Sequence, residues 1–405
     1  MTETQPEPAA FPMPRATGCP FDPAPGYRQL QAEQPIARVR QWDGAAPWLV
    51  TGHADARALL ADPRFSVETD KPGHPHPSPA TKQIMGSPGM ISRMDDPEHG
   101  RLRRMVTREF TVRRVESMRQ RIQAITDDLI DGILAGPNPT DLVEKLALPI
   151  PSLVICELLG VPYEDREFFQ RTTSAFVMRS TTVEQAKAAM MELLDRLDQL
   201  VTEKAENPGD DLLSRLVVER LEKGEITREV LVGLTQLLLS GGYETTANMI
   251  ALGIVALLQH PEQLAVLRDT EDPKVVANAV DELLRYLTVP QMGARRAALV
   301  DADVNGHPVR QGEGVIISIA TANRDSTVYP DPDVLDIGRD TGQHLAFGHG
   351  IHQCVGAPLA RLELQIVYRT LFRRVPSLRL AVGFDQLPFK HDGLLNGLYE
   401  LPVAW

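Results

Sequence analysis

A single cysteine near the C-terminal end of the chain has the neighbours that a reactive thiolate needs. Cys354 follows Gly348 and Gly350, which permit tight backbone turns, and precedes Pro358, which suits the first turn of a helix. Free backbone N–H groups and the positive end of that helix would both favour the thiolate form of the cysteine. Gly356 removes a side chain where a flat object could approach. The pattern therefore fits a metal-bound thiolate beside a planar cofactor.

Two other interpretations of this cysteine are open. A lone cysteine is most often an inert core residue. The second interpretation is zinc, because His344, His349, His352 and Cys354 lie within eleven residues. Structural zinc sites usually take their ligands in spaced pairs from two segments, and this cluster has no partner pair elsewhere in the sequence. Zinc is therefore the minor alternative.

The segment around the cysteine resembles the haem-thiolate signature of the cytochrome P-450 monooxygenases, Phe-Gly-x-Gly-x-His-x-Cys-x-Gly. Its fixed positions are filled here by Phe347, Gly348, Gly350, His352, Cys354 and Gly356. The resemblance implies that the cofactor is haem b, bound in part by Phe347 and Gly356. It also implies that Cys354 is the proximal ligand of the iron, a thiolate whose electron donation favours O–O cleavage.

A second motif lies in the middle of a long predicted helix over residues 227–259. At 1.5 Å per residue this helix would run about 50 Å and cross the core. Gly241 and Gly242 inside it cost up to ~1 kcal/mol each relative to alanine, so room for a ligand or close helix packing is expected. Close packing with Glu244 in a core hydrogen bond remains an alternative. The resemblance implies an oxygen-binding groove, with Glu244 and Thr245 as the catalytic acid and alcohol that deliver protons.

Arginines are concentrated between residues 101 and 121, where eight arginines oppose Glu109 and Glu116, so 8 − 2 gives +6 in a chain of net charge −12. Such a run is usually a solvated face. The resemblance implies that His99 and Arg103, four apart on one helical face, bind the haem carboxylates together with Arg296 and His352. Four donors for two carboxylates are chemically reasonable.

Glu282 and Arg285 lie three residues apart on another predicted helix. An acid and a base at this spacing are commonly a solvated ion pair worth a few tenths of a kcal/mol. They precede Asn323-Arg324-Asp325 and Tyr329-Pro-Asp-Pro, an order that resembles the Glu-x-x-Arg helix and meander of the same family. The resemblance implies that these residues brace the cysteine loop and do no chemistry.

We expect the substrate to be a small apolar organic molecule, secondary-metabolite or drug-like, that is hydroxylated or epoxidised with O2. A breaker-rich segment, residues 71–90, predicts a loop that could serve as a lid. The substrate contacts are expected at Met90, Ile91, Phe176, Val177, Leu237, Ser240, Gly241, Val289, Met292, Leu394 and Leu395. A peroxide-driven haem enzyme, which would not need Glu244 and Thr245, and a haem-binding sensor without turnover are the alternatives.

The elements that must position these residues are mostly helical. Helical periodicity predicts helices over residues 98–132, 141–159, 183–206, 211–223, 227–259, 261–269, 274–287 and 359–370. Short β-like runs are expected at 45–51, 298–304 and 314–319, with a turn at Asn305-Gly306 between the last two. Seven prolines in the first 25 residues predict an extended arm on the surface over residues 1–20. Residues 21–405 are then one mainly α domain with a minor β-sheet, a cytochrome P-450-like fold.

Composition limits the location and the partners. A net charge of −12 argues against a nucleic-acid binder with a basic surface. Three dispersed cysteines do not make a disulfide framework, which indicates the cytoplasm, and the acidic N-terminus lacks the features of a signal peptide. The longest clean apolar run has ten residues against the ~20 that span a bilayer, so no membrane anchor is expected. The resemblance is to soluble actinobacterial members, which take electrons from a ferredoxin and its reductase; a monomer is expected.

Overall fold

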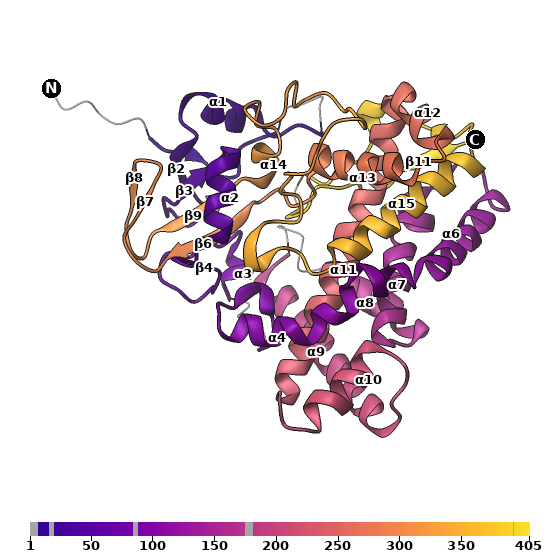
Figure 1. Ribbon diagram of the computed structural model, residues 1–405, viewed down its shortest axis with the longest axis horizontal. Coiled ribbons are helices and arrows are strands. Elements are labelled where there is room, and N and C mark those ends of the chain that lie inside the picture. The colour runs from indigo at the N-terminus through magenta and orange to yellow at the C-terminus, as the bar shows by residue number, and fades with distance from the viewer. Residues whose placement is uncertain (1–6, 16–19, 84–87, 175–180, 392) are drawn as a thin grey trace.

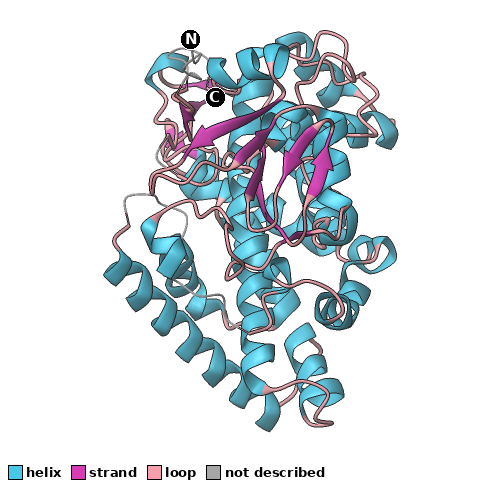
Figure 2. Ribbon diagram, turned by 90° about the vertical axis from the view of Figure 1, so that its left-hand side faces the viewer, coloured by secondary structure: helices cyan, strands magenta, loops and turns pink. Residues whose placement is uncertain are grey.

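The computed structural model describes residues 7–15, 20–83, 88–174, 181–391 and 393–405 (Figure 1). Helices dominate it, and the strands of the main sheet lie on the side opposite β11 and the C-terminus (Figure 1 and Figure 2). The α-helices are α1 (Pro25–Glu33), α2 (His53–Ala61), α3 (Pro79–Gln83), α4 (Glu98–Thr107), α5 (Val112–Glu116), α6 (Arg119–Leu134), α7 (Pro149–Leu159), α8 (Arg166–Ser174), α9 (Val183–Glu206), α10 (Leu212–Leu216), α11 (Arg228–Gln259), α12 (Pro261–Asp269), α13 (Pro273–Leu287), α14 (Ile319–Ala322) and α15 (Ala357–Arg374). The strands are β1 (Ala9–Ala10), β2 (Ile36–Arg40), β3 (Trp48–Val50), β4 (Phe65–Ser66), β5 (Thr140–Asp141), β6 (Ala294–Ala298), β7 (Ala302–Val304), β8 (His307–Val309), β9 (Gly314–Ile317), β10 (Arg379–Leu380) and β11 (Pro402–Ala404).

Helix α11 is the axis of the fold. Its 32 residues are capped at the start by Thr227, whose hydroxyl oxygen accepts the N–H of Val230 at 3.4 Å. The two halves of the helix belong to different apolar clusters, with side chains of residues 231–239 in one cluster and those of residues 249–257 in the other. Helices α7, α9 and α15 pack against it. The middle of α11, residues 240–248, therefore lies between two cores, and this is where the glycine pair and the acid–alcohol pair occur.

The main sheet has six strands in the order β1-β2-β3-β9-β6-β4. Strands β3 and β9 pair in parallel, and β9 and β6 pair antiparallel, with Arg296 opposite Val315 and Arg295 opposite Ile316. Because side chains alternate along a strand, Arg295 and Arg296 leave β6 on opposite faces. Helix α2 packs on one of these faces through Ala56, Leu59 and Leu60.

Most helix predictions are confirmed, and the differences have local causes. Helices α9 and α12 have the predicted bounds, and α11 and α13 differ from them by one residue. The predicted helix 98–132 is divided into α4, α5 and α6, with a 3₁₀ turn at Arg108–Phe110 between the first two. The regions predicted as helices 141–159 and 211–223 contain π-helical turns at Val143–Ala147 and Val217–Leu221, and 141–159 also begins in a strand, β5.

Three other predictions are wrong in part. Residues 298–304 are not one strand, because they include the end of β6, a turn and β7, and the turn Asn305-Gly306 joins β7 to a strand β8 that was not expected. The breaker-rich segment forms one short helix, α3. The N-terminal arm is not wholly on the surface, because β1 pairs with β2 and Phe11 is buried against Tyr27 and Leu49.

Among the described helices, none is by itself long and apolar enough to cross a membrane. Taken together, α11 and α12 have the required length and apolar composition, but the chain bends by 112° between them.

Candidate active site

The cysteine loop is shaped by glycines that no other residue replaces easily. Gly348 and Gly350 have φ values of +72° and +75°, which side-chain-bearing residues rarely adopt. A Cβ atom at Gly350 would also lie 2.9 Å from Cα of Ala61 in α2. The backbone N–H of Cys354 then donates to the carbonyl oxygen of Phe347 at 2.8 Å, and α15 begins three residues later. The loop thus places the thiol just before the N-terminus of α15, as predicted.

Cys354 is an exposed residue whose thiol has protein atoms around it. The residue is exposed, yet the surrounding protein removes enough water that burial raises the pKa of the thiol. The N–H groups of Gly356 and Ala357 and the guanidinium of Arg103 act against this effect and favour the thiolate. A bound cation at the sulfur would complete the stabilisation of the thiolate.

Four cationic or hydrogen-bonding side chains meet beside this loop, as the sequence predicted. The rings of His99 and His352 lie 4.2 Å apart between their centroids, and Nε2 of His99 and Nδ1 of His352 are buried with no partner. Burial, together with His99 and Arg296, lowers the pKa of His352 to about 4. Arg103 donates to the carbonyl oxygen of Gln353 at 2.5 Å. Buried ring nitrogens without partners are uncommon in native proteins, and each becomes a donor when the imidazole is protonated beside an anion, so this cluster is suited to bind a group with carboxylates, such as the propionates of haem.

One face of α11 is open although the rest of the helix is buried. Leu237, Ser240, Gly241 and Thr245 follow each other at helical spacing, and Gly241 is exposed while the other three are half-buried. A Cβ atom added at Gly241 would meet nothing within 4 Å. At Gly242 the same atom would lie 3.1 Å from Cδ1 of Ile155 in α7. Of the two glycines, Gly242 therefore permits close helix packing, whereas Gly241 leaves room for a ligand.

Glu244 is buried behind this open face. Its Oε1 lies 3.6 Å from Nζ of Lys390, and its Oε2 has no partner. Burial raises the pKa of Glu244 to about 7, although Lys390 acts in the opposite direction. The neighbouring Thr245 hydroxyl donates to the carbonyl oxygen of Gly241 at 2.7 Å. Lys390 gave no signal in the sequence, because it is remote in the chain and belongs to no motif.

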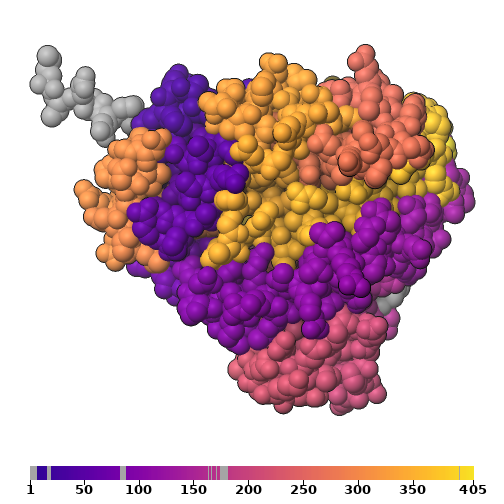
Figure 3. All heavy atoms as spheres, in the orientation of Figure 1, coloured from indigo at the N-terminus to yellow at the C-terminus, as the bar shows by residue number. Residues whose placement is uncertain are grey.

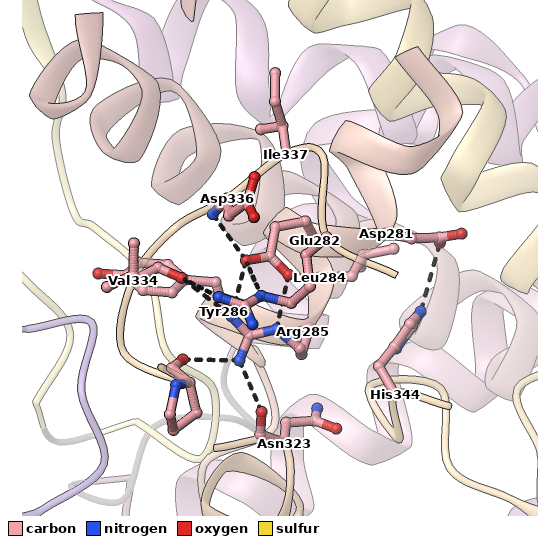
Figure 4. Close-up of polar contacts among 12 residues, drawn as sticks. Asp281, Glu282, Leu284, Arg285, Tyr286, Asn323, Val334, Asp336, Ile337 and His344 are labelled. Atoms are coloured by element: carbon pink, nitrogen blue, oxygen red, sulfur yellow. Dashed lines mark hydrogen bonds and ion pairs between the residues drawn. The ribbon is translucent and has the colours of Figure 1, made fainter. Parts of the chain in front are cut away.

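The Glu282–Arg285 pair is fully buried, so the solvated interpretation is wrong (Figure 4). Arg285 donates from Nε and Nη2 to the two carboxylate oxygens of Glu282 at 2.7 and 2.8 Å, and from Nη1 to the carbonyl oxygens of Asn323 and Pro332. The side chain of Asn323 accepts the N–H of Leu345 at 2.7 Å, at the start of the cysteine segment.

A second contact between α13 and the cysteine segment comes from Asp281. Its carboxylate lies 3.4 Å from the ring of His344 and 2.7 Å from Nε of Arg361, on either side of the cysteine loop. The helix that carries Glu282 and Arg285 therefore fixes both ends of the loop, in agreement with the predicted brace.

The described residues do not form a zinc site. Among the described residues no group of three histidine, cysteine or acidic side chains is placed to hold a metal ion. The histidines near Cys354 point to other partners, since His344 faces Asp281 and His352 stacks on His99.

Comparison with known proteins decides the family. The sequence model described as Cytochrome P450 matches residues 50–376. The chain belongs to the cytochrome P450 family. It is 55% identical to Cytochrome P450 GfsF of Streptomyces halstedii over 98% of this chain and 96% of that protein. The crystal structure of GfsF has a TM-score of 0.92 and covers 98% of this chain and 100% of that chain.

Two other relatives cover nearly the whole chain. The Vitamin D3 dihydroxylase of Streptomyces griseolus is 46% identical over 98% of this chain and 97% of that protein. The crystal structure of CYP105P1 in complex with filipin I has 41% sequence identity and a TM-score of 0.92, and it covers 98% of this chain and 99% of that chain. The mainly α, cytochrome P450-like fold is thus confirmed.

As a P450, the protein binds haem b and is a haem-thiolate monooxygenase, an oxidoreductase that uses O2 and acts on small organic molecules. When bound, the haem supplies the iron chemistry by which one atom of O2 enters an organic substrate while the other leaves as water.

The expected substrate contacts lie in three different parts of the interior. Ile91 and Leu237 belong to one apolar cluster, Val289 and Leu395 to a second, and Met292 and Leu394 to a third. Met90 is buried, next to the turn that Gly89 makes against the first part of α11. Phe176 and Val177 lie outside the described residues.

Proposed function

We propose that Cys354 is the proximal ligand of the haem iron and that His99, Arg103, Arg296 and His352 hold its two carboxylates. The observation that carries this proposal is the pair of buried nitrogens without partners, Nε2 of His99 and Nδ1 of His352, beside a cysteine that begins a helix. Phe347, which stacks on Arg361 at 4.6 Å, and Gly356, which lies against the sulfur, complete the cofactor-binding loop.

Glu244 and Thr245 are the proton-delivering pair of this proposal. The hydroxyl of Thr245 lies on the open face of α11, and the carboxyl group of Glu244 lies behind it with a pKa of about 7. A group with this pKa is half protonated near neutral pH, so it can both give and take a proton. Lys390 positions the carboxylate through Oε1.

The substrate that we propose is a mainly apolar secondary metabolite, hydroxylated or epoxidised by the enzyme. The open face of α11 is formed by Leu237, Ser240 and Gly241, and only one of these side chains is polar. Relatives with described ligands or products include a structure of CYP105P1 with filipin I and one of a C21 methyl hydroxylase with mycinamicin VIII.

A ferredoxin and its reductase are the proposed electron donors, and the arginine-rich stretch is the proposed docking face. Figure 3 shows this part of the chain as a purple band across the molecule, beside the yellow C-terminal segment that includes α15. Glu98, Glu157 and Glu219 pair with three of its arginines, so 6 − 3 leaves a local excess of +3. Arg104 and Arg113 are exposed and make no ion pair with any described residue. Arg113 follows Val112, which is 73% exposed, and an exposed apolar residue with a basic rim is suited to an acidic partner.

The proposed location is the cytoplasm and the proposed state is a monomer. The three cysteines of the sequence are odd in number and widely separated, which agrees with a reducing compartment.

Replacement of the cysteine tests the haem assignment. Cys354→Ala should abolish the thiolate-type carbon monoxide spectrum of the reduced protein, because no other residue of the loop offers an anionic sulfur. Cys156→Ala is the matched control, since it removes a buried thiol in α7 and should keep the spectrum. A Cys354→Ala protein with an unchanged spectrum would show that the ligand is misassigned.

A further inference from the structure

Arg295 is a half-buried cation whose guanidinium nitrogens Nε and Nη2 are themselves buried, and it is not one of the residues proposed to hold the haem. It lies in β6 directly before Arg296, and the two side chains leave the strand on opposite faces. The charge of Arg296 lowers the pKa of His352, which belongs to the cluster proposed to hold the haem carboxylates. The strand partner of Arg295 is Ile316, which packs with Tyr27, Leu49 and Met292. Arg295 therefore belongs to the other face of the sheet.

The guanidinium of Arg295 presents an unused pair of donors. Its Nη1 donates to the carbonyl oxygen of Gly293 at 3.3 Å, whereas Nε and Nη2 are buried and have no partner among the described residues. These two nitrogens form one edge of the planar fork, which matches the two oxygens of a carboxylate. Elsewhere in this chain the same edge holds a carboxylate, at Arg101 with Glu98 and at Arg285 with Glu282.

The charges around Arg295 leave it uncompensated. Burial lowers its pKa to about 10, so it stays charged at neutral pH, and within the described part of the chain Tyr27 is the other group that affects its pKa. His74 and His76 face it from the segment before α3, and Nδ1 of His74 is buried without a partner. Burial lowers the pKa of His74 to about 3, so this ring is neutral and supplies no counter-charge. A buried charge without a partner is costly, which indicates that a ligand completes the site.

Apolar surface and open space lie near β6, next to the strand partner of Arg295. Met292 and Leu394, two of the expected substrate contacts, pack in the cluster that contains Ile316 and Tyr27. A cavity of about 560 Å³ borders the same cluster and is lined in part by Met13, Tyr27 and Met292. A molecule with an apolar skeleton therefore has room beside this cluster.

We propose that Arg295 anchors a carboxylate of the substrate, so that this enzyme takes apolar molecules that carry an acid group. The inference rests on the proposed monooxygenase site, because the acid end of the molecule is held at β6 while its apolar part lies against Met292 and Leu394. His74 borders the same site and can accept or donate one further hydrogen bond.

Matched acid and ester probes test the anchor. The probes are dodecanoate and methyl dodecanoate, and 4-phenylbutyrate and its methyl ester. Binding to the haem-loaded protein is followed by the Soret shift and, independently, by titration calorimetry. Wild type should bind at least one acid about tenfold more tightly than its ester, since the fork donates two charge-assisted hydrogen bonds to the acid alone. Arg295→Gln should reduce this ratio to about one, and Arg295→Lys, which keeps the charge but not the fork, should retain only part of it.

Measurements of stability and haem content distinguish a ligand-binding role of Arg295 from a structural role and from a role in haem binding. If Arg295 serves a ligand, Arg295→Met should raise the apparent Tm of the ligand-free protein by a few degrees, because an unpaired buried charge is removed. A lower Tm would mean that the residue is structural and would overturn the proposal. Arg40→Gln, on β2 of the same sheet, is the control and should change neither property.

Three further results would contradict the anchor: no acid preference in wild type, a preference that survives Arg295→Gln, or loss of haem from that variant. Loss of haem would assign the guanidinium to a haem carboxylate instead. Failure of the haem assignment itself would be visible separately, as a missing carbon monoxide band in wild type.

Discussion

Glu244 should make the stability of the protein fall as the pH rises through neutrality. Its carboxyl group is 4% exposed, its Oε2 has no hydrogen-bond partner, and its pKa is raised by burial from 4.5 to about 7. Between these two pH values the folded protein keeps a proton that the unfolded chain releases. Folding then binds a proton, so the free energy of unfolding decreases with increasing pH in this window.

The size of the effect follows from the two pKa values. The difference between 4.5 and 7, at about 1.4 kcal/mol for each tenfold change in proton affinity, amounts to ~3 kcal/mol. The full loss is reached only above pH 7, and below pH 4.5 the group contributes none. Glu244→Gln keeps the shape of the side chain but cannot ionise. We therefore expect wild type and variant to have similar stability near pH 5 and the variant to be more stable by up to ~3 kcal/mol at pH 8.

The measurement is the guanidinium unfolding midpoint of both haem-loaded proteins at pH 5, 6, 7 and 8. The difference between the two proteins isolates Glu244 from all other titrating groups. Glu229→Gln, in the exposed first turn of the same helix, is the control and should show no gain at high pH. The raised pKa, and with it the proton-relay role, would be refuted if the difference in unfolding midpoint between wild type and Glu244→Gln stayed constant with pH or increased toward low pH.

Three other results are expected. Thr245→Ala should release hydrogen peroxide in place of product for each reducing equivalent while haem and substrate binding stay nearly intact, and Thr245→Ser should restore coupling; unchanged coupling in the alanine variant would remove the hydroxyl from the proton route. Electron transfer from an acidic ferredoxin should slow with added salt and with Arg113→Glu but change less with Arg119→Glu, whose arginine is already paired with Glu116; a salt-independent rate would contradict this docking face. Arg285→Ala should cost about 3–5 kcal/mol of stability and loosen haem, because it removes the bidentate partner of the buried Glu282 and leaves that carboxylate with Arg339 at 3.2 Å, and a loss as small as that of a surface pair would refute the brace.

The sequence predicted those parts of the fold in which local pattern and tertiary structure agree. Helix α9 has a complete capping box at Thr182 and Gln185, and α12 begins at Pro261, so the bounds of both helices could be predicted from the sequence. The π-helical turns at Val143–Ala147 and Val217–Leu221 could not be predicted, because each covers five residues, too few for its wider period to stand out from the α-helical pattern around it. Strand β8 was missed because three residues that include Pro308 carry little alternation.

The candidate site was predictable where a motif fixed it and hidden where only the fold creates it. Glu282 and Arg285 have the same spacing as many surface pairs, and only burial shows that their pairing is structural. Lys390 reaches Glu244 across 146 positions of sequence, since 390 − 244 is 146, and no local pattern announces such a contact. Arg295 and Arg296 are identical in type and adjacent, so the sequence could not show which one faces the haem carboxylates before the register of β6 was known.

Buried charges in this protein differ in how completely they are satisfied, and that difference separates structural positions from functional ones. Arg285 is fully satisfied by Glu282 and by backbone carbonyl oxygens, and it does no chemistry. Glu363, whose Oε2 has no partner, can become neutral, because burial raises its pKa well above 4.5. Glu244 is intermediate, with one oxygen near Lys390 and a pKa near the working pH, which is the condition for moving protons. Arg295 has no carboxylate partner among the described residues, and it cannot become neutral, because a guanidinium with a pKa of about 10 keeps its proton at neutral pH. A counter-charge from outside the chain is the remaining way to stabilise it, and a substrate carboxylate is the ligand whose geometry matches its two free nitrogens.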